Sequence, residues 1–491
     1  MHVDEAVHGI KFGYLLEDGS YKYDPVEYHG PSLNYLTLIP AWLSGKRSVA
    51  EIDEALLRSV PAISGLLLIL SFVLLYKDFG WRFVLAVSIV TSLSSFIVFY
   101  NRYYIQESLF VSFFYAGIIS LYWYVRSKKI LSLLIAAVLL ALSYASKETF
   151  IISLAAIAIS FIVVRKHDCA FRMEKSHVAI FFASFFVVAV LLFSSFFTNP
   201  RGILDSLQSL GNYFSKANSF PGHHQPWYYY FGLVSFASID GFIYTEAIML
   251  VFFVAGLYHL VVDKQPAACP VILLRIIASF TIVTMIIYSL IPYKTPWTMF
   301  TLWQGILIIA SYAAVKIYDT VNRKIFYVFT AIFCIHLAYQ TWHTTFTFSY
   351  HPANPFVYAH STNDVVEISE LIKNVSASQK NKNSLSIYVA AKGNDYWPLP
   401  WYLRGFKNVS WNDRVNDNVY KYELVLVSPE YESTLAEALY KFPPPGEGHL
   451  YVPLFESYME LRPGIEIRGY VRKSVFDAFT NARTVPEGGQ K

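Results

Sequence analysis

Ten long apolar runs dominate this chain and restrict what it can fold into. A helix needs about 17–25 predominantly apolar residues to cross a lipid bilayer. The mean hydropathy of +0.39 and the low share of charged residues, 15%, are atypical of a soluble protein. We therefore predict a polytopic α-helical membrane protein of about ten transmembrane helices, centred on residues 61–76, 83–100, 108–125, 130–144, 149–164, 178–198, 242–262, 271–291, 297–315 and 325–342.

The polar gaps between these runs differ in charge. Alternate gaps are rich in basic residues, namely Lys77, Arg82, Arg126, Lys128, Lys129, Arg165, Lys166, Arg172, Lys175, Lys264, Arg275, Lys316, Arg323 and Lys324. The positive-inside rule places these gaps in the cytoplasm. The other gaps, and with them residues 1–60 and the tail after 342, are then predicted to be extracytoplasmic. The pattern indicates a multi-pass protein of the cell membrane whose unusual polar motifs face outward.

Three regions follow from composition. Residues 1–60 are predicted to form a first extracytoplasmic loop, 61–342 a transmembrane bundle with a long outer loop at 199–241, and 343–491 an extracytoplasmic soluble domain. In the tail the apolar runs shrink to strand length and charged residues return. Helices are expected at 363–375 and 430–440 and strands at 385–391 and 424–428, which favours an α/β or α+β domain.

The N-terminus has no signal-peptide apolar region, although the charge pattern places it outside. We expect a further transmembrane helix upstream of Met1; entry through the first long hairpin is the alternative. The three cysteines, Cys169, Cys269 and Cys334, fall in predicted cytoplasmic loops or helices, so no disulfide framework is expected. No glycine-rich phosphate loop and no basic stripe occurs, which argues against nucleotide and nucleic-acid binding.

An acidic pair near the start of the chain combines with two imidazoles: His2, Asp4, Glu5 and His8. If this segment is helical, Asp4 and His8 lie one turn apart on one face. A solvated loop is the simplest interpretation of such a pair. A metal site is an alternative, because the spacing resembles the HExxH motif with Asp in place of the first His.

Three cations stand at the predicted outer ends of different helices, where basic residues are disfavoured: Arg102, Lys147 and Lys294. That depth is where the phosphate of a membrane lipid lies. Snorkelling of a basic side chain to the interface is the alternative for each of them. Two histidines, His29 and His223, also face outward and can donate to a phosphate or bind a metal, although such a histidine is more often structural.

Further polar and aromatic residues face outward with these cations. Glu107 opens a predicted helix, where it complements the helix dipole. Aromatic residues make up 18% of the chain, more than two interfacial belts need. Trp227, Tyr228 and Trp397 are therefore candidates for sugar or acceptor contacts, with packing and membrane anchoring as the alternative. His223 and Glu107 are further candidates for such contacts.

Taken together, these motifs resemble those of the GT-C membrane glycosyltransferases, which take sugar from a polyprenyl-phosphate carrier. The chain looks most like the flippase-activity-associated protein family, related to protein O-mannosyltransferases and aminoarabinose transferases. The resemblance runs from Val3 to Trp342 and extends into the tail through the string from Trp397 to Arg404. It implies a GT-C-like helical bundle, a polyprenyl-phosphate-linked sugar as donor, and a glycan or protein hydroxyl as acceptor.

In the enzymes of this type an aspartate of a DE or DD pair in the first outer loop is the proposed base, and this motif falls on Asp4 and Glu5. The resemblance thus implies that these two residues are catalytic. A lipid phosphate is already a good leaving group, so one carboxylate base and fixed cations suffice for transfer. On this interpretation Arg102, Lys147, Lys294 and His29 bind the donor phosphate, and a divalent metal remains an open alternative.

Two other functions compete with the enzyme. A flippase or transporter of lipid-linked sugars would carry ionisable residues near the middle of the bilayer, broken helices and internal repeats. Here the apolar runs are nearly free of charge and the polar groups gather at one face, which favours a one-sided enzyme. A non-catalytic partner in a glycosylation complex is the third alternative.

Overall fold

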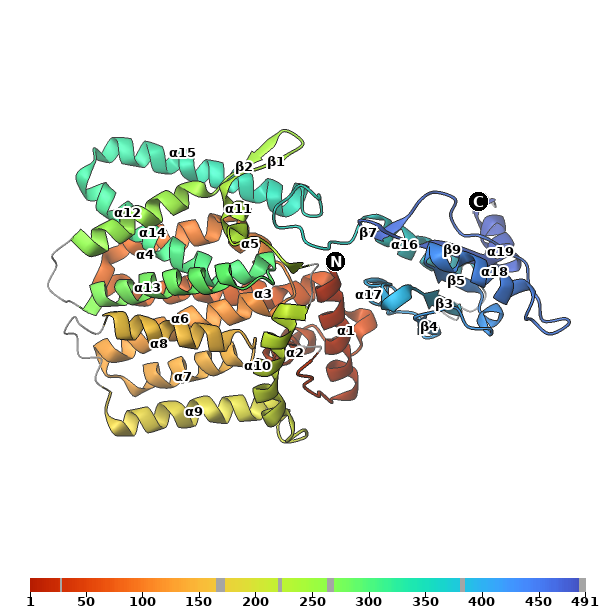
Figure 1. Ribbon diagram of the computed structural model, residues 1–491, viewed down its shortest axis with the longest axis horizontal. Coiled ribbons are helices and arrows are strands. Elements are labelled where there is room, and N and C mark those ends of the chain that lie inside the picture. The colour runs from red at the N-terminus through yellow and green to blue at the C-terminus, as the bar shows by residue number, and fades with distance from the viewer. Residues whose placement is uncertain (27–28, 165–172, 220–222, 263–268, 380–384, 485–491) are drawn as a thin grey trace, which may run out of the picture. The chain divides into compact units, whose positions relative to one another are not determined.

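The structure is a computed structural model that describes residues 1–26, 29–164, 173–219, 223–262, 269–379 and 385–484 (Figure 1). It divides into two compact units, which we describe separately. The membrane unit comprises Tyr14–Lys46 and Asp53–Tyr358, and the tail unit comprises Met1–Gly13, Arg47–Ile52 and Ala359–Lys491. Arg165, Lys166, Arg172, Lys264 and Cys169, which entered the sidedness and cysteine predictions, lie outside the described residues.

The membrane unit is a helical bundle, and each of the ten apolar runs is mainly helical. Its helices are α2 (Ser32–Leu43), α3 (Glu54–Ser71), η2 (Phe72–Leu75), α4 (Tyr76–Leu93), α5 (Ser95–Asn101), α6 (Gln106–Ser127), α7 (Ile130–Tyr144), α8 (Phe150–Val164), α9 (Lys175–Phe193), α10 (Gly202–Ser219), α11 (Tyr229–Ser235), α12 (Ala247–Val262), α13 (Cys269–Leu290), η4 (Pro296–Met299), α14 (Phe300–Thr320), α15 (Arg323–Trp342) and the π-helical turn η5 (His343–Thr347). One boundary was predicted wrongly: the start of the run 242–262 is a strand, β2 (Phe242–Tyr244), paired with β1 (Ala237–Ile239).

Length and composition support membrane insertion. Six helical stretches of the described chain are long and apolar enough to cross a membrane: Glu54–Leu93, Gln106–Ser127, Lys175–Phe193, Pro270–Leu290, Pro296–Thr320 and Arg323–Thr347. Three shorter apolar helices, α7, α8 and α12, accompany them. The prediction of a polytopic helical membrane protein is confirmed.

The helices differ in how deeply they lie in the bundle. α6 and α14 are central, because 78% and 83% of their apolar stretches are buried in the bundle. α9 and α15 are peripheral, with 17% buried in each. Gly256 allows α12 to approach α14, since a Cβ there would lie 2.5 Å from the carbonyl oxygen of Ile309. Small residues of this kind drive close helix packing where no hydrophobic effect acts between helices. The apolar surface of α9 and α15 suits contact with lipid.

The two ends of the bundle differ in chemistry. We call the end formed by residues 29–32, 101–107, 145–149 and 291–295 the polar end. The opposite end, the basic end, holds Arg82 and Arg323 together with Arg126, Lys128, Lys129 and Lys324. Two ion pairs join helices there: Arg126 contacts Asp78 at 2.8 Å, and Arg82 contacts Asp319 at 3.4 Å.

The tail unit is built on a mixed five-stranded sheet of order β4-β3-β5-β9-β6. Its strands are β3 (Ile387–Ala390), β4 (Val409–Asn412), β5 (Leu424–Val427), β6 (Tyr451–Pro453) and β9 (Arg468–Arg472); β7 (Glu460–Arg462) and β8 (Ile465–Glu466) form a separate ribbon. β3, β4 and β5 are parallel to one another, and β9 is antiparallel to its neighbours. The predicted α/β or α+β tail domain is confirmed.

Helices cover both faces of this sheet because its central strands are apolar on both sides. α16 (Asp364–Ala377) and α19 (Lys473–Thr484) pack on the face that carries Ile387 and Leu424, and α18 (Glu432–Tyr440) packs on the face that carries Tyr388 and Val425. Four short helices complete the tail: η6 (Lys392–Asn394), α17 (Leu399–Tyr402), η7 (Val419–Lys421) and η8 (Pro429–Tyr431).

The first sixty residues are largely helical. α1 (Val3–Asp18) begins in the tail unit and ends in the membrane unit, and η1 (Val49–Glu51) belongs to the tail unit. Arg404 joins η1 to the tail, donating to the carbonyl oxygens of Val49 at 3.1 Å and Ile52 at 2.6 Å. The segment that carries Asp4 and Glu5 is therefore part of the same compact unit as residues 359–491.

Candidate functional site

A loop at the polar end, residues 145–149, is fixed by backbone pairing to residues 30–32. Gly30 N–H donates to the carbonyl of Ser146 at 3.1 Å, and Ser32 N–H donates to the carbonyl of Ala145 at 3.0 Å. The approach requires glycine, because a Cβ on Gly30 would lie 2.1 Å from the carbonyl oxygen of Ala145. This pairing places His29 beside the charged loop between α7 and α8.

Two pairs of an acidic and a basic side chain form at this loop. Lys147, 6% exposed, is ion-paired with the buried Glu107 at the start of α6, and His29 Nδ1 lies 2.9 Å from Glu148 Oε2. Burial opposes the charge on Lys147, but Glu107 and Glu148 overcome it and raise the pKa of Lys147. Burial likewise opposes the charge on Glu148, yet His29 and Lys147 lower its pKa to about 2. The neighbouring charges thus favour the charged forms of Lys147 and Glu148 despite their burial.

Lys294 is held by a second backbone pairing, between residues 223–225 and 292–294. Lys294 N–H donates to the carbonyl of His223 at 3.0 Å, and Gln225 N–H donates to the carbonyl of Pro292 at 3.0 Å. His224 and Tyr293 form the bridge between these two contacts. The ladder fixes the backbone from which the Lys294 side chain projects.

The ammonium of Lys294 differs from that of Lys147. The residue is 1% exposed, and burial lowers its pKa. Its Nζ donates to the carbonyl oxygen of Ile291, and among the described residues no carboxylate pairs with it. A buried cation without an anionic partner is costly. An anion that reached Lys294 would therefore offset part of this cost.

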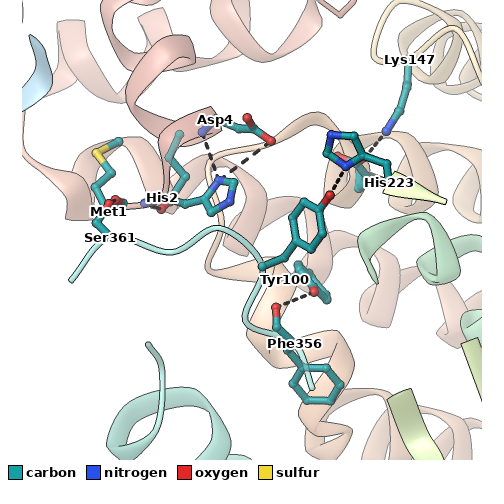
Figure 2. Close-up of polar contacts among 11 residues, drawn as sticks. Met1, His2, Asp4, Tyr100, Lys147, His223, Phe356 and Ser361 are labelled. Atoms are coloured by element: carbon teal, nitrogen blue, oxygen red, sulfur yellow. Dashed lines mark hydrogen bonds and ion pairs between the residues drawn. The ribbon is translucent and has the colours of Figure 1, made fainter. Parts of the chain in front are cut away.

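His223 and Arg102 are engaged by neighbouring groups. The ring of His223 contacts the hydroxyl of Tyr358 through Nδ1 (Figure 2). It also lies 4.9 Å from the ring of Tyr293. Arg102 donates to the carbonyl of Thr345 in η5, at 2.5 Å, and stacks over Phe346 at 4.1 Å. These contacts fix the turn that follows α15, so Arg102 has a structural partner that the sequence did not reveal.

The predicted aromatic contacts lie in different units. Trp227 and Tyr228 precede α11 in the membrane unit and are 66% and 55% exposed, with their rings in edge contact. Trp397 precedes α17 in the tail unit and contacts Tyr396. The structure thus brings Glu107, Lys147 and His29 together, places Lys294 and His223 on one ladder, and leaves Trp227 and Tyr228 exposed.

The acidic pair lies in the tail unit, at the first turn of α1, and its two members differ. Glu5 is fully buried and accepts from the backbone N–H of His2 at 3.0 Å, as a residue that caps a helix does. The Asp4 side chain is 45% exposed, and its backbone N–H donates to His2 Nδ1 at 3.0 Å (Figure 2). The Asp4 carboxylate is thus accessible, whereas the Glu5 carboxylate is committed to the helix start.

Comparison with known proteins gives the fold. ArnT from Cupriavidus metallidurans is similar over 95% of this chain and 93% of its own, at 12% identity, with a TM-score of 0.59 in the apo state and 0.61 with bound undecaprenyl phosphate. This chain has the GT-C fold. The Archaeoglobus fulgidus oligosaccharyltransferase, solved with Zn and sulfate, matches with a TM-score of 0.53 over 87% of this chain and 64% of its own, at 12% identity. No protein-family model and no curated protein matches the sequence.

The metal alternative raised by the spacing of His2, Asp4 and His8 can be compared with the positions of the described side chains. Across the described ranges no group of three or more His, Cys, Asp or Glu side chains is close enough to hold a metal ion. His2 and Asp4 form at most a pair, with Nδ1 and Oδ2 3.9 Å apart. In the described residues the acidic segment at His2–His8 therefore offers no third ligand beside this pair.

Some residues of the polar end could not be selected from the sequence. Glu148 follows Lys147 directly, but its partner His29 is 119 residues away, and only the pairing of residues 30–32 with 145–149 joins them. Tyr358 contacts His223 across 135 residues. The signal in the sequence for Glu148 was its position next to Lys147, a predicted phosphate ligand. No such signal existed in the sequence for Tyr358.

Proposed function

We propose that this protein is an integral membrane glycosyltransferase that moves a sugar from a polyprenyl-phosphate carrier to an acceptor hydroxyl. The single observation that carries the proposal is Lys294, a buried ammonium with no carboxylate partner among the described residues, at the polar end of a GT-C bundle. A lipid phosphate at that end supplies the anion that this cation lacks. Charge-assisted bonds between an ammonium and a phosphate are about twice as strong as neutral ones.

The donor class is supported by two further features. Lys147 adds a second cation whose charge is maintained by Glu107, and His29 adds an imidazole beside Glu148. The similar ArnT structure contains undecaprenyl phosphate. We infer that Lys294 and Lys147 bind the donor phosphate, with His29 as a further donor group; the same role for Arg102 stays a prediction.

The transfer step needs one base. The acceptor oxygen attacks the anomeric carbon, the bond from that carbon to the phosphate oxygen breaks, and the polyprenyl phosphate leaves with the bonding electron pair. The acceptor proton passes to a carboxylate, a role that we assign to Asp4 by resemblance to the enzymes of this type. The exposure of Asp4 and the burial of Glu5 support the choice between the two. Lysines at the phosphate offset the charge that develops on the leaving group.

Sidedness remains part of the proposal. Because the basic residues gather at one end of the bundle, that end is assigned to the cytoplasm and the polar end to the outside. Single cysteines at Lys129 and Tyr228, introduced into a cysteine-free background, should react with an impermeant maleimide from opposite sides of sealed vesicles. Both positions are exposed, so a failure to react would report sidedness rather than burial. Labelling of both from one side would contradict the assignment.

A reconstituted assay tests the activity. Purified protein in liposomes is given a radiolabelled polyprenyl-phosphate sugar and candidate glycan or peptide acceptors, and both transfer and movement of the donor between leaflets are measured. The proposal expects transfer that is lost in the Asp4→Asn variant. Donor movement without transfer would identify a flippase, and neither activity in any acceptor mixture would favour a non-catalytic partner.

A further inference from the structure

An apolar groove lies on the lipid-facing side of the bundle, away from the polar end. It has a volume of about 290 Å³ and is walled by α4, α12, α14 and α15. Its lining is almost wholly apolar, with Ile89, Phe252 and Phe333 among the side chains that face it. α15, the outer wall, is the peripheral helix of the bundle (Figure 1).

The groove has a charged mouth. Arg82 lines it at the basic end, and its guanidinium lies 4.3 Å from the ring centre of Tyr318, another lining residue. Arg323 lies over the same ring at 5.9 Å, at the first position of α15, where the helix dipole adds positive potential. Two arginines thus gather on one aromatic ring at one end of an apolar channel.

The acidic group at this mouth does not neutralise both arginines. Asp319 lies 3.4 Å from Arg82, and the side chains are 57% and 59% exposed. An exposed pair of this kind contributes about 0–1 kcal/mol, so an anion can compete for the guanidinium. The mouth therefore keeps an excess of positive charge that an anionic head group complements.

The length of the groove matches one leaflet. The lining runs from Arg82 to Val90 on α4 and from Phe326 to Cys334 on α15, which in each case is a rise of about 12 Å along the helix. Half of the hydrocarbon core of a bilayer is about 15 Å thick. A lipid whose head group lies at the arginines would place one acyl chain along the groove.

We propose that this groove binds one acyl chain of an anionic phospholipid from the leaflet at the basic end, with the head-group phosphate at Arg82 and Arg323. Basic pockets between transmembrane helices recognise anionic head groups in this way. The site is separate from the proposed donor site, because Lys147 and Lys294 lie at the other end of the bundle. The bound chain would fill the space between α15 and the bundle and so hold this peripheral helix in place.

Lipid retention tests the head-group part of the proposal. Protein purified in mild detergent is exchanged into mixtures of phosphatidylglycerol and phosphatidylcholine, and bound lipid is measured by native mass spectrometry. A basic residue near an anionic lipid contributes about a fivefold preference, from about 1 kcal/mol. We expect Arg82→Gln and Arg323→Gln each to lower the preference for phosphatidylglycerol about fivefold, with Lys129→Gln as the control that leaves it unchanged. Equal retention of the two lipids by the wild type would overturn the proposal.

Cys334 tests the position of the chain, because this free thiol lines the groove. Phosphatidylglycerol should slow its reaction with a membrane-permeant maleimide in detergent, and Ala314→Trp, which fills the groove, should abolish lipid retention. Ile335→Trp is the matched control, since Ile335 lies on α15, is 70% exposed and does not line the groove. Equal loss of lipid in both tryptophan variants, or lipid retention in Ala314→Trp, would place the chain elsewhere.

Discussion

Replacing Lys294 by methionine should make the protein more stable and less active at once. Methionine has a similar length and no charge, so it removes the buried ammonium with little change in packing. A buried polar group without an adequate partner costs about 1–3 kcal/mol, and an unpaired charge costs more. In lipid-free detergent the variant should therefore unfold at a higher temperature than the wild type, whose buried ammonium has no carboxylate partner in the described ranges.

Donor binding should change in the opposite direction. A hydrogen bond to a charged group contributes about 1.5–3 kcal/mol, which corresponds to a roughly 10- to 150-fold weaker affinity for polyprenyl phosphate. At a ligand concentration of 100 times the wild-type Kd, binding stabilises the wild type by about 2.7 kcal/mol. A 100-fold weaker site under the same conditions gains only about 0.4 kcal/mol. Melting curves with and without polyprenyl phosphate measure both effects in one experiment.

Lys147 supplies the contrasting variant. Lys147→Met leaves the buried Glu107 without its cation, and breaking a buried pair in this way typically costs about 3–5 kcal/mol. The two buried lysines should thus shift the melting temperature in opposite directions, while Lys129→Met, at an exposed position, should shift it little. Destabilisation of Lys294→Met as strong as that of Lys147→Met would refute a costly buried cation at this position. Full stabilisation of Lys294→Met by polyprenyl phosphate would refute its role in phosphate binding.

Four further variants and one control test the site. Asp4→Asn should lower turnover about 10²- to 10⁴-fold. Glu5→Gln should lower turnover less but reduce thermal stability, since Glu5 caps α1. A larger loss of turnover in Glu5→Gln than in Asp4→Asn would assign the base to Glu5 instead. The folded-state pKa of Glu148 is lowered to about 2, so its charge stabilises the fold above about pH 4.5 and this contribution is lost as the pH falls toward 2. In Glu148→Gln the melting temperature should therefore change less with pH across that window. An unchanged slope would argue against the His29 contact. Gly30→Ala should destabilise the protein by about 1–3 kcal/mol through overpacking, while Gly232→Ala, which meets nothing within 4 Å, serves as the control in the same denaturation experiment.

The membrane bundle could be predicted from the sequence because it depends on hydropathy, which can be summed residue by residue along the chain. A run of apolar residues becomes a helix in lipid whatever lies beside it, since every backbone polar group must be satisfied internally. The error at 242–244 has the same origin: three apolar residues extend the run 242–262, but they pair as a strand with Ala237–Ile239. Pairing depends on a partner segment, and hydropathy carries no information about partners.

The N-terminal segment was harder to interpret for a different reason. Its polar composition suggested a loop, yet Val3–Asp18 is helical, and its first half belongs to the same compact unit as residues 359–491. Buried faces such as those of Ala6 and Phe12 stabilise this helix. Contacts with residues more than three hundred positions away, such as those of Arg404 with Val49 and Ile52, cannot be inferred from one sequence.

The three cations at the polar end show how much of the site one sequence can predict. From the sequence, Arg102, Lys147 and Lys294 had the same predicted role, because each stands at the end of a helix. One sequence indicates how deep a residue lies in the membrane, but not which residue it contacts. The structure separates them: Arg102 donates to a backbone carbonyl, Lys147 faces Glu107, and Lys294 is buried without a carboxylate in the described part of the chain. A cation that already has a partner must weaken that contact to bind an incoming anion, whereas Lys294, within the described ranges, has no carboxylate contact to weaken. Affinity for a lipid phosphate should therefore depend most on Lys294, less on Lys147, and least on Arg102.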